Sequence, residues 1–263
     1  MSKAKILLLD VETAPILAHV WGLWDQTVAL NQIKSDWYIL SWSAKWLGTT
    51  ANKVMYADSR NNKNLEDDSK LIAGIWKLLD EADIVITQNG KAFDHKKLNA
   101  RFIIKGFKPP STFKYIDTLQ LAKKHFAFTS NKLEYMSDKL CKKYKKLKHE
   151  KFSGFEMWRE CLAGNQAAWK EMEKYNKYDV LALEELYTKL IPWDNSINFN
   201  LYHDGTENVC TCGSTKFTRN GHAYTSLGKF QKYTCSECGS EQRSRVNVFS
   251  EDKKKSLRTG TTR

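Results

Sequence analysis

The sequence lacks any long hydrophobic run. No apolar stretch approaches the ~20 residues that span a bilayer. The first apolar run, Ile6–Leu9, ends at Asp10, and no charged-then-apolar leader with a cleavage site precedes it. A hydrophobic share of 41% and an aromatic share of 12% also exclude a disordered chain. We therefore expect a folded cytoplasmic protein, neither membrane-bound nor secreted.

Acidic residues are scarce relative to basic ones. The chain has 42 Lys and Arg against 30 Asp and Glu, a net charge of +12. The excess is spread along the chain, with +5 in residues 200–263 (11 basic, 6 acidic) and +7 in the rest. This balance favours a polyanionic partner, most often nucleic acid, with mere solubility as the alternative.

Cysteine is also sparse, with six residues that are unevenly placed. Cys141 and Cys161 stand alone in helical-looking sequence, where core thiols are expected. The other four are clustered, which in a cytoplasmic chain indicates metal binding rather than disulfides. The clustered residues are Cys210, Cys212, Cys235 and Cys238.

The hydrophobic pattern predicts an α/β domain with a mixed central sheet flanked by helices. Strands are expected at Lys5–Val11, Tyr38–Trp46, Lys53–Ala57, Asp83–Gln88 and Lys114–Ile116. Helices are expected at Asp68–Glu81, Phe93–Lys105, Thr118 to near His125, Lys132–Lys143, Phe155–Ala163 and Asn165–Leu190. Asp117 is expected to cap the third of these helices. Residues 16–38 have weak periodicity and are expected to form a long ordered loop.

Four segments follow from the composition. Pro192 ends the last helix, so residues 1–192 form the first domain. Residues 193–205 are polar and predict a linker. Residues 206–248 hold the cysteine cluster, and the charged residues 249–263 predict a disordered basic tail.

The first acidic motif, Asp10-Val11-Glu12, closes the first strand. Because side chains alternate along a strand, Asp10 and Glu12 point to one face and Val11 points into the core. Two adjacent carboxylates repel each other, and a cation between them stabilises the pair. Such a pair is also common on surfaces. The apolar run before it favours a site, because the end of a central strand is where open α/β sheets bind ligands.

Two further acidic motifs lie downstream. Asp94 follows an apolar strand and precedes a helix, so it is expected at the same edge of the sheet, with a helix cap as the alternative. Tyr175 and Asp179 are four residues apart, hence on one face of the long last helix. A solvated helix with an accidental Tyr/Asp pair would explain this motif alone.

In this order, Asp-x-Glu, Asn-x-x-x-Phe-Asp and Tyr-x-x-x-Asp resemble the DEDDy-type 3′–5′ exonucleases. The pattern is most similar to the branch related to the proofreading domain of family B DNA polymerases and covers roughly residues 4–190. It implies a ribonuclease H-like fold, two Mg²⁺ or Mn²⁺ ions, and Tyr175 as the catalytic residue that orients water. The catalytic metal ligands that it implies are Asp10, Glu12, Asp94 and Asp179. It also implies substrate contacts from Asn89 and Phe93.

A site of this kind hydrolyses phosphodiester bonds from a 3′ end and releases nucleoside 5′-monophosphates. Single-stranded DNA is the favoured substrate, because the second motif resembles the polymerase-associated branch. An RNA-trimming exonuclease and a structure-specific endonuclease are alternatives on the same fold. A non-catalytic nucleic-acid-binding recruitment protein is a third, although such a protein has no physical reason to keep mutually repelling carboxylates.

Two sets of residues are candidates for holding substrate. Tryptophans near the N-terminus are expected either to stack on unpaired bases or to belong to the core. They are Trp21, Trp24, Trp37, Trp42 and Trp46. A dense basic run is expected either to contact a phosphate backbone or to form a solvated helix end and loop. Its members are Lys139, Lys142, Lys143, Lys145, Lys146, Lys148 and Lys151.

The cysteine cluster predicts one structural Zn²⁺ ion in a tetrahedral site. Cys210-x-Cys212 and Cys235-x-x-Cys238 resemble the zinc ribbons of transposases and other DNA-associated proteins. The first pair is one residue shorter than usual, which leaves His203 or His222 as substitute ligands. We expect this zinc ribbon to contact nucleic acid, and docking of a protein partner is the alternative.

Overall fold

The computed structural model describes residues 4–147 and 151–261. One compact unit is Ala4–Tyr187, and a second begins at Thr188. The division falls within the long helix α6 (Gln166–Leu190), a few residues before the predicted boundary at Pro192. No helix of the described ranges is long and apolar enough to cross a membrane.

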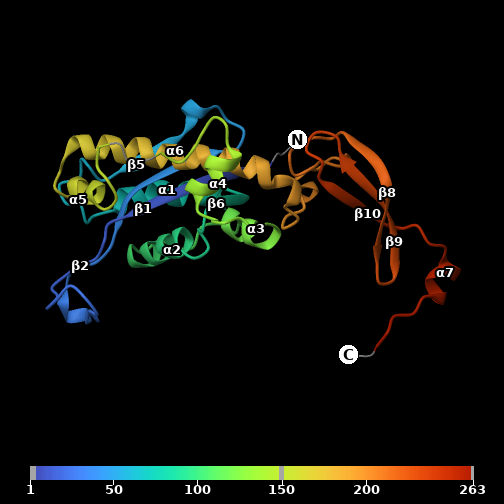
Figure 1. Ribbon diagram of the computed structural model, residues 1–263, viewed down its shortest axis with the longest axis horizontal. Coiled ribbons are helices and arrows are strands. Elements are labelled where there is room, and N and C mark those ends of the chain that lie inside the picture. The colour runs from blue at the N-terminus through green and yellow to red at the C-terminus, as the bar shows by residue number, and fades with distance from the viewer. Residues whose placement is uncertain (1–3, 148–150, 262–263) are drawn as a thin grey trace. The chain divides into compact units, whose positions relative to one another are not determined.

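The first unit is built on a five-stranded sheet in the order β5-β4-β1-β6-β7. Figure 1 labels β1, β5 and β6 of this sheet among the helices of the unit. The strands are β1 (Ile6–Thr13), β4 (Ile39–Trp46), β5 (Met55–Asp58), β6 (Ile84–Thr87) and β7 (Lys114–Asp117). β4 and β5 run antiparallel to their neighbours, whereas β1, β6 and β7 are mutually parallel. The predicted mixed central sheet of a ribonuclease H-like fold is therefore confirmed.

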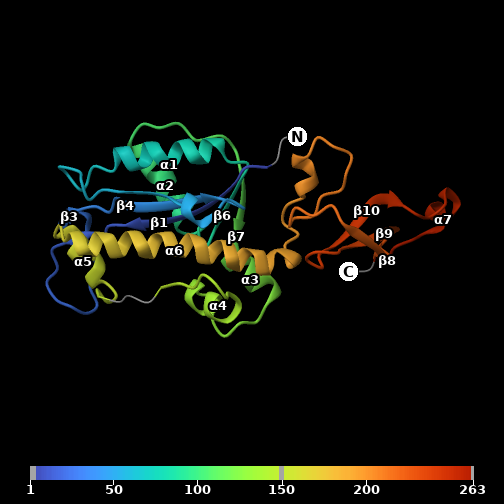
Figure 2. The same cartoon turned by 90° about the horizontal axis from the view of Figure 1, so that it is seen from above.

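Helices cover both faces of this sheet. Figure 2 shows α1 (Ser69–Glu81) on one face and α6 on the other. Alternation along β1 places Leu7, Leu9 and Val11 in the core cluster that includes the buried residues of α1. The remaining helices of the unit are α2 (Asp94–Ile104), α3 (Thr118–His125), α4 (Leu133–Leu140), α5 (Glu156–Leu162) and the short 3-10 turn η2 (Ala51–Lys53). Asp10 and Glu12 consequently lie toward the face that α6 covers.

Residues 16–35 leave the sheet and return to it, and we call this segment the Trp flap. It contains a two-stranded pair, β2 (Leu17–Ala18) with β3 (Ile33–Ser35), and the turn η1 (Leu30–Gln32). A long loop is expected here from the sequence. The weak periodicity hides these short strands because the flap has no buried side (see below).

The second unit carries a three-stranded antiparallel sheet in the order β10-β9-β8. Its elements are β8 (Phe217–Thr225), β9 (Gly228–Cys235), β10 (Glu241–Asn247), and the turns η3 (Ile191–Trp193) and η4 (Phe199–Tyr202). The tail expected to be disordered contains a short helix, α7 (Glu251–Ser256), which corrects that expectation. Ser250 caps it by accepting a hydrogen bond from the Lys253 backbone, and acidic residues in its first turn complement the helix dipole. Thr262 and Arg263 lie outside the described residues.

Candidate active site

The strand β1 ends with the first two candidate ligands. In the β1–β4 register, Asp10 lies opposite Ser43 and Glu12 opposite Ser41, and the register shifts directly after Glu12. Small side chains opposite the acids leave room for α6 to approach this face. Asp10 and Glu12 both keep part of their surface open to solvent. The end of β1 is thus reachable from outside.

The structure brings three predicted ligands into one cluster. Carboxylate oxygens of Asp10, Glu12 and Asp179 all lie within 4.8 Å of one another. Asp179 comes from α6 and is 3% exposed, so it forms the closed side of the cluster. The fourth predicted ligand, Asp94, is not among these three, but it is buried close by: its Oδ1 accepts a hydrogen bond from the Val11 backbone N–H at 3.0 Å. Asp94 is thereby held against the strand between Asp10 and Glu12.

Asn176 holds Asp10 in place, a role that our sequence prediction missed. Its side-chain amide donates to Asp10 Oδ2, and its Oδ1 accepts from the Ser41 hydroxyl at 3.2 Å. Asn176 is fully buried, so these partners fix the amide's orientation. The signal was in the sequence, since Asn176 precedes Asp179 by three residues and therefore shares its helical face.

Lys146 is the second residue missed in this role. Its ammonium lies 2.7 Å from Asp179 Oδ2 and 4.6 Å from the centre of the Tyr175 ring. Burial alone would lower the pKa of this ammonium, but Asp179, Tyr175 and Asp10 raise it above its usual range. Lys146 was predicted only as part of a basic run, because its position depends on the loop after α4. Lys148 of that run lies outside the described residues.

Burial raises the pKa values of all four carboxyl groups, and repulsion by neighbouring carboxylates adds to the rise for Glu12, Asp94 and Asp179. Burial raises the pKa of Asp179 to about 7, the charge of Asp10 adds to the shift, and Lys146 opposes it. The pKa values of Glu12 and Asp94 lie well above their usual range, first through burial and then through Asp10. Burial also raises the pKa of Asp10, against the effects of Lys146 and Asn176. One ammonium therefore does not neutralise the cluster.

Tyr175 lies one helical turn before Asp179. The side chain is 7% exposed, and its ring meets Trp158 edge-on at 6.3 Å between centroids. Burial, and next the charge of Asp179, raise the pKa of the phenol above its usual range. The hydroxyl consequently keeps its proton at neutral pH and can donate a hydrogen bond beside the carboxylates.

The turn between β6 and α2 carries Asn89 and Phe93, both exposed. Asn89 has a positive φ of 64°, and Gly90 lies so close to β6 and β7 that a Cβ would come within 2.1 Å of Thr87 Oγ1. Asp117 holds this turn by accepting from the backbone N–H groups of Asn89 at 2.9 Å and Lys91 at 3.3 Å. It also caps α3, as expected. The turn is thus fixed where Asp94 begins α2.

The donor set fits a hard divalent cation. All the converging ligands are carboxylate oxygens, which Mg²⁺ and Mn²⁺ prefer. Asp179 Oδ1 is buried and has no hydrogen-bond partner in the described part of the chain. A buried oxygen of this kind is costly unless a donor or cation meets it. The cluster has the charge, the atoms and the unfilled acceptor that a metal site requires.

The four clustered cysteines also converge, in the second unit. Their ligand atoms lie within 4.8 Å of one another, with Cys210 Sγ 3.5 Å from Cys238 Sγ and Cys212 Sγ 3.7 Å from Cys235 Sγ. Sulfurs bound to one tetrahedral zinc ion at ~2.3 Å would be roughly 3.8 Å apart, and disulfide sulfurs only about 2.05 Å. The spacing suits zinc. All four candidate ligands are cysteines, and neither His203 nor His222 belongs to the cluster.

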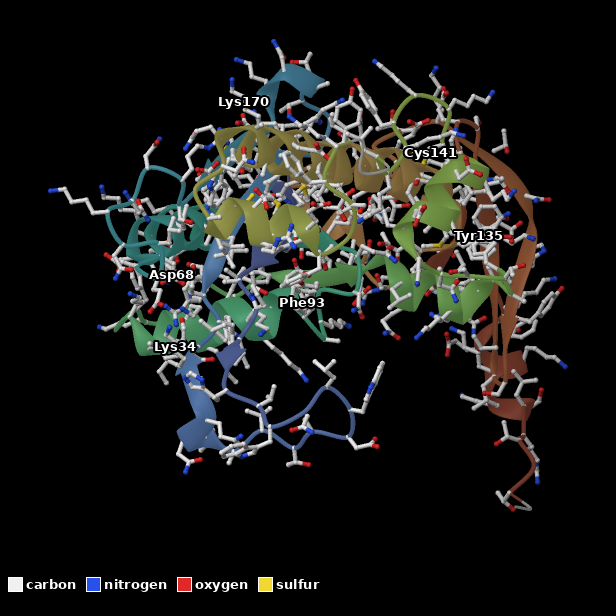
Figure 3. All side chains as sticks on the ribbon, turned by 60° about the vertical axis from the view of Figure 1, so that its left-hand side comes forward. Lys34, Asp68, Phe93, Tyr135, Cys141 and Lys170 are labelled. Atoms are coloured by element: carbon white, nitrogen blue, oxygen red, sulfur yellow. The ribbon has the colours of Figure 1, made fainter. Side chains whose placement is uncertain are left out.

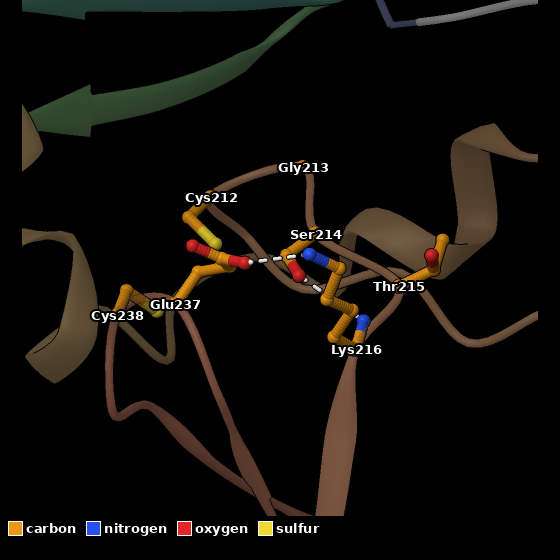
Figure 4. A pocket seen from close by; sticks show the side chains of 7 residues that line it. All are labelled: Cys212, Gly213, Ser214, Thr215, Lys216, Glu237 and Cys238. Carbon is orange, nitrogen blue, oxygen red and sulfur yellow. Dashed lines mark hydrogen bonds and ion pairs between the residues drawn. The ribbon is translucent and has the colours of Figure 1, made fainter.

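Backbone N–H groups support the thiolates. Burial raises the pKa of Cys235, but the N–H groups of Cys238 and Glu237 outweigh it and lower the pKa to about 7. Burial raises the pKa of the Cys212 and Cys238 thiols above the usual range, and backbone N–H groups of Ser214 and Ser240 only partly oppose it. Figure 4 shows the open side of the cluster, where the Lys216 ammonium lies 3.2 Å from the Glu237 carboxylate. Gly213 and Gly239 adopt positive φ in the two turns, so the shortened first turn still delivers both sulfurs.

The tryptophans of the predicted stacking set separate by burial. Trp42 is buried in the core, and Trp37 and Trp46 pack against it. Trp21 and Trp24 on the Trp flap are 97% and 83% exposed. Base stacking therefore has two free candidates in this set.

The match to one family model agrees with the fold. A family model described as the RNase_H superfamily matches residues 45–191, a range that contains Asp94 and Asp179 and begins after Asp10 and Glu12. A search among curated proteins finds no match. Among solved structures, the chain is similar to the family B DNA polymerase from the hyperthermophilic archaeon Pyrobaculum calidifontis, with a TM-score of 0.49 and 12% identity. The match covers 72% of this chain and 25% of the polymerase, so the chain spans about a quarter of that protein's length.

Proposed function

Because the chain belongs to the RNase H superfamily, we propose that its carboxylate cluster hydrolyses nucleic acid as a metal-dependent 3′–5′ exonuclease. The observation that carries this proposal is the convergence of Asp10, Glu12 and Asp179 within 4.8 Å. Three carboxylates from two distant segments, with raised pKa values, are costly to assemble unless they bind cations. Nucleic acid as substrate also agrees with the net charge of +12.

Four carboxylates would hold the metal, namely Asp10, Glu12, Asp94 and Asp179. When bound, two Mg²⁺ or Mn²⁺ ions would neutralise these groups, activate a water and stabilise the leaving 3′-oxygen. Tyr175 then orients the attacking water through its neutral hydroxyl. Asn176 keeps Asp10 in its ligand geometry, and Lys146 limits the repulsion around Asp179. The products are a nucleoside 5′-monophosphate and a strand shortened at its 3′ end.

Phe93 and Asn89 are proposed to contact the terminal nucleotides. Both are exposed on the fixed turn that leads into Asp94, which supports this role. Single-stranded DNA is the proposed substrate, and RNA is the competing outcome of the test below.

We propose a single structural zinc ion for the cysteine cluster, within a zinc ribbon at residues 206–248. We also propose residues 1–192 as the catalytic domain and 193–205 as the connection. In the ribbon register, Arg219 pairs with Tyr233 and Tyr224 with Lys229, so two cations and two aromatics share one face. The opposite face carries Lys232, which is paired with Glu241 at 2.9 Å.

The mixed basic and aromatic face favours nucleic acid over a protein partner for the ribbon. Replacing Arg219 and Lys229 by Ala should weaken DNA binding and lower its salt dependence. Lys232→Ala, on the opposite face, is the matched control. Equal affinity of all variants for DNA would favour the docking of a protein.

The nuclease itself is tested with 5′-labelled single-stranded DNA, the same sequence as RNA, and a single-stranded DNA circle. With Mg²⁺ or Mn²⁺ we expect a ladder that shortens from the 3′ end of the linear strands and leaves the circle intact. EDTA and Asp10→Asn should abolish it, while Glu81→Gln, an exposed carboxylate at the end of α1, should not. Cleavage of the circle would indicate an endonuclease, and binding without cleavage would indicate a recruitment protein.

A further inference from the structure

The Trp flap exposes more apolar surface than any comparable segment of the described chain. Eight of the eighteen large apolar side chains that are exposed in the described ranges fall within residues 16–30. They are Ile16, Leu17, Val20, Trp21, Leu23, Trp24, Val28 and Leu30. Such a concentration on a soluble surface marks a contact site.

Polar groups, not packing, give the flap its shape. The His19 backbone N–H donates to the Gln32 carbonyl at 2.9 Å, and the Gln32 amide returns a bond to the His19 carbonyl at 2.9 Å. Gln32 Oε1 also accepts from the Ala29 backbone at 2.8 Å. No residue of 16–35 is buried. The flap is therefore ordered while its apolar side chains remain outside.

The flap begins and ends at the candidate active site. β1 leads from Glu12 into it, and the segments that flank it are joined by the Ala14 N–H, which donates to the Tyr38 carbonyl at 2.9 Å. Beside its second end, the Lys97 ammonium lies 3.6 Å from the ring centre of Trp37 and 5.8 Å from that of Phe93. Figure 3 shows the flap reaching away from the sheet on the side where Phe93 and Lys34 are labelled. An aromatic and cationic row thus connects the cluster with the flap.

We propose that the Trp flap holds the unpaired strand that leads to the 3′ end, with Trp21 and Trp24 stacked on its bases. This inference rests on the proposed nuclease function and assigns its substrate as a single strand several nucleotides long. Trp21 is the ninth residue after Glu12, and at most ~3.5 Å per residue allows a reach of about 30 Å. Lys97 at the foot of the flap is placed to meet a phosphate of the same strand.

Three features favour nucleic acid over a protein as the occupant. The flap is continuous with the site that would cleave the strand. Its most exposed side chain is Trp21, at 97%, and Trp24 is 83% exposed; the flat faces of both rings match every base. A cation lies between Phe93 and the flap's end. A base-paired strand hides its base faces, so this surface selects single strands.

The test compares Trp21→Ala, Trp24→Ala and Trp21→Phe with Phe155→Ala. Phe155 is a matched control because it is 62% exposed on a different element, at the start of α5. With oligonucleotides of about 16 residues we expect each Trp→Ala change to raise KM by about tenfold, with kcat little changed. Trp21→Phe should keep most of the affinity, since the ring can still stack. The increase should vanish for a trinucleotide, which is too short to reach the flap.

Abasic substrates identify the base that is stacked. Removing the bases of the nucleotides upstream of the 3′ end should raise KM for the unaltered protein and have no further effect in Trp21→Ala/Trp24→Ala. Equal KM values for all variants and all lengths would overturn the proposal, even if the flap then proves to bind another protein.

A binding measurement separates this proposal from the proposed function. In the Asp10→Asn background, where no cleavage is expected, the quenching of tryptophan fluorescence by single-stranded DNA reports affinity. Loss of affinity with Trp21→Ala and Trp24→Ala, but no hydrolysis by the unaltered protein, would uphold the flap and refute the nuclease. Hydrolysis by the unaltered protein, together with unchanged affinity of the Trp variants for single-stranded DNA, would uphold the nuclease and refute the role of the flap.

Discussion

The carboxylate cluster and the cysteine cluster both gather groups that repel one another when ionised, but they differ in what holds them in place. Asp10 and Glu12 lie on β1, the central strand of the buried sheet, and Asp179 lies on α6, which packs on one face of that sheet. Three of the cysteines lie on turns beside a small sheet, and Cys235 is the last residue of its strand β9. In β8, β9 and β10 together, the buried positions are Gly228 and Cys235.

This difference assigns different roles to the two proposed metal sites. A core that folds without the cation can release and rebind it, and the partly open ends of Asp10 and Glu12 leave room for substrate. A sheet without an apolar core needs its metal to fold, and four thiolates leave no position for a reactant. The first cluster suits catalysis and the second suits structure.

The largest expected effect comes from removing a cysteine. Cys235→Ser should release the zinc and unfold residues 210–247, because zinc binding contributes about 10–16 kcal/mol to small thiolate sites. The unit Ala4–Tyr187 should stay folded. Zinc content and hydrogen exchange followed by mass spectrometry measure both effects. Cys161→Ala, at a lone buried thiol, is the control, and protected β8–β10 amides without zinc would contradict the comparison.

Removing a carboxylate should lower the activity without destabilising the fold. Glu12→Gln should lower the rate of hydrolysis by about 10²–10³-fold. In metal-free protein the same change should leave the melting temperature equal or higher, because it removes a charge that Asp10 and Asp179 repel. Single-turnover rates and thermal melting in EDTA test this. A clear loss of stability would mean that Glu12 supports the fold instead.

Replacing Lys146, which lies beside the same carboxylate cluster, should have a smaller effect on activity. Lys146→Met should lower kcat/KM by about tenfold and move the pH profile to higher pH, since this ammonium lowers the pKa values of Asp10, Glu12 and Asp179. Lys145→Met is the matched control, because Lys145 pairs with the exposed Asp138 at 3.0 Å. Equal pH profiles for the two variants would exclude a role of Lys146 at the site.

The smallest expected effect is the pH dependence of stability. The pKa of Asp179 is raised to about 7 in the folded protein, so folding binds its proton more tightly. Metal-free protein should therefore be most stable near pH 4 and lose stability as pH rises through about 7. Thermal melting in EDTA at a series of pH values measures the change, since ~1 kcal/mol moves the melting temperature by roughly 2–4 °C at this size.

Mg²⁺ needs the ionised carboxylates, so it should flatten or reverse this slope. Asp179→Asn should weaken the slope in metal-free protein. An identical slope in the variant would place the titration elsewhere, for example at the ribbon thiols.

Much of the central fold could be predicted because buried elements carry strong periodic signals. The predicted helix Asp68–Glu81 and strand Asp83–Gln88 agree with α1 and β6 to within one residue at each end. They agree because the apolar positions of both elements face one core. β2 and β3 could not be found this way, because their apolar residues point outward. Helix α7 depends on a cap and on charges rather than on burial, so its charged sequence resembles a disordered tail.

The candidate site was predictable where its residues lie on regular elements. Strand alternation places Asp10 and Glu12 on one face, and helical spacing pairs Tyr175 with Asp179. Asn176 follows from the same spacing. Lys146 does not, because a loop brings it to the cluster and the sequence pattern of a loop does not determine its path. Which tryptophans are exposed (Trp21 and Trp24) and which is buried (Trp42) likewise depends on tertiary packing.

Electron paramagnetic resonance on zinc-loaded protein can count the Mn²⁺ ions that the carboxylate cluster binds. We predict Mn²⁺ binding that tightens as pH rises through about 7, and its loss in Asp10→Asn while the zinc content stays the same. The same Mn²⁺ binding by the unaltered protein and by Asp10→Asn would show that the carboxylate cluster is not the metal site, and would contradict the proposed chemistry.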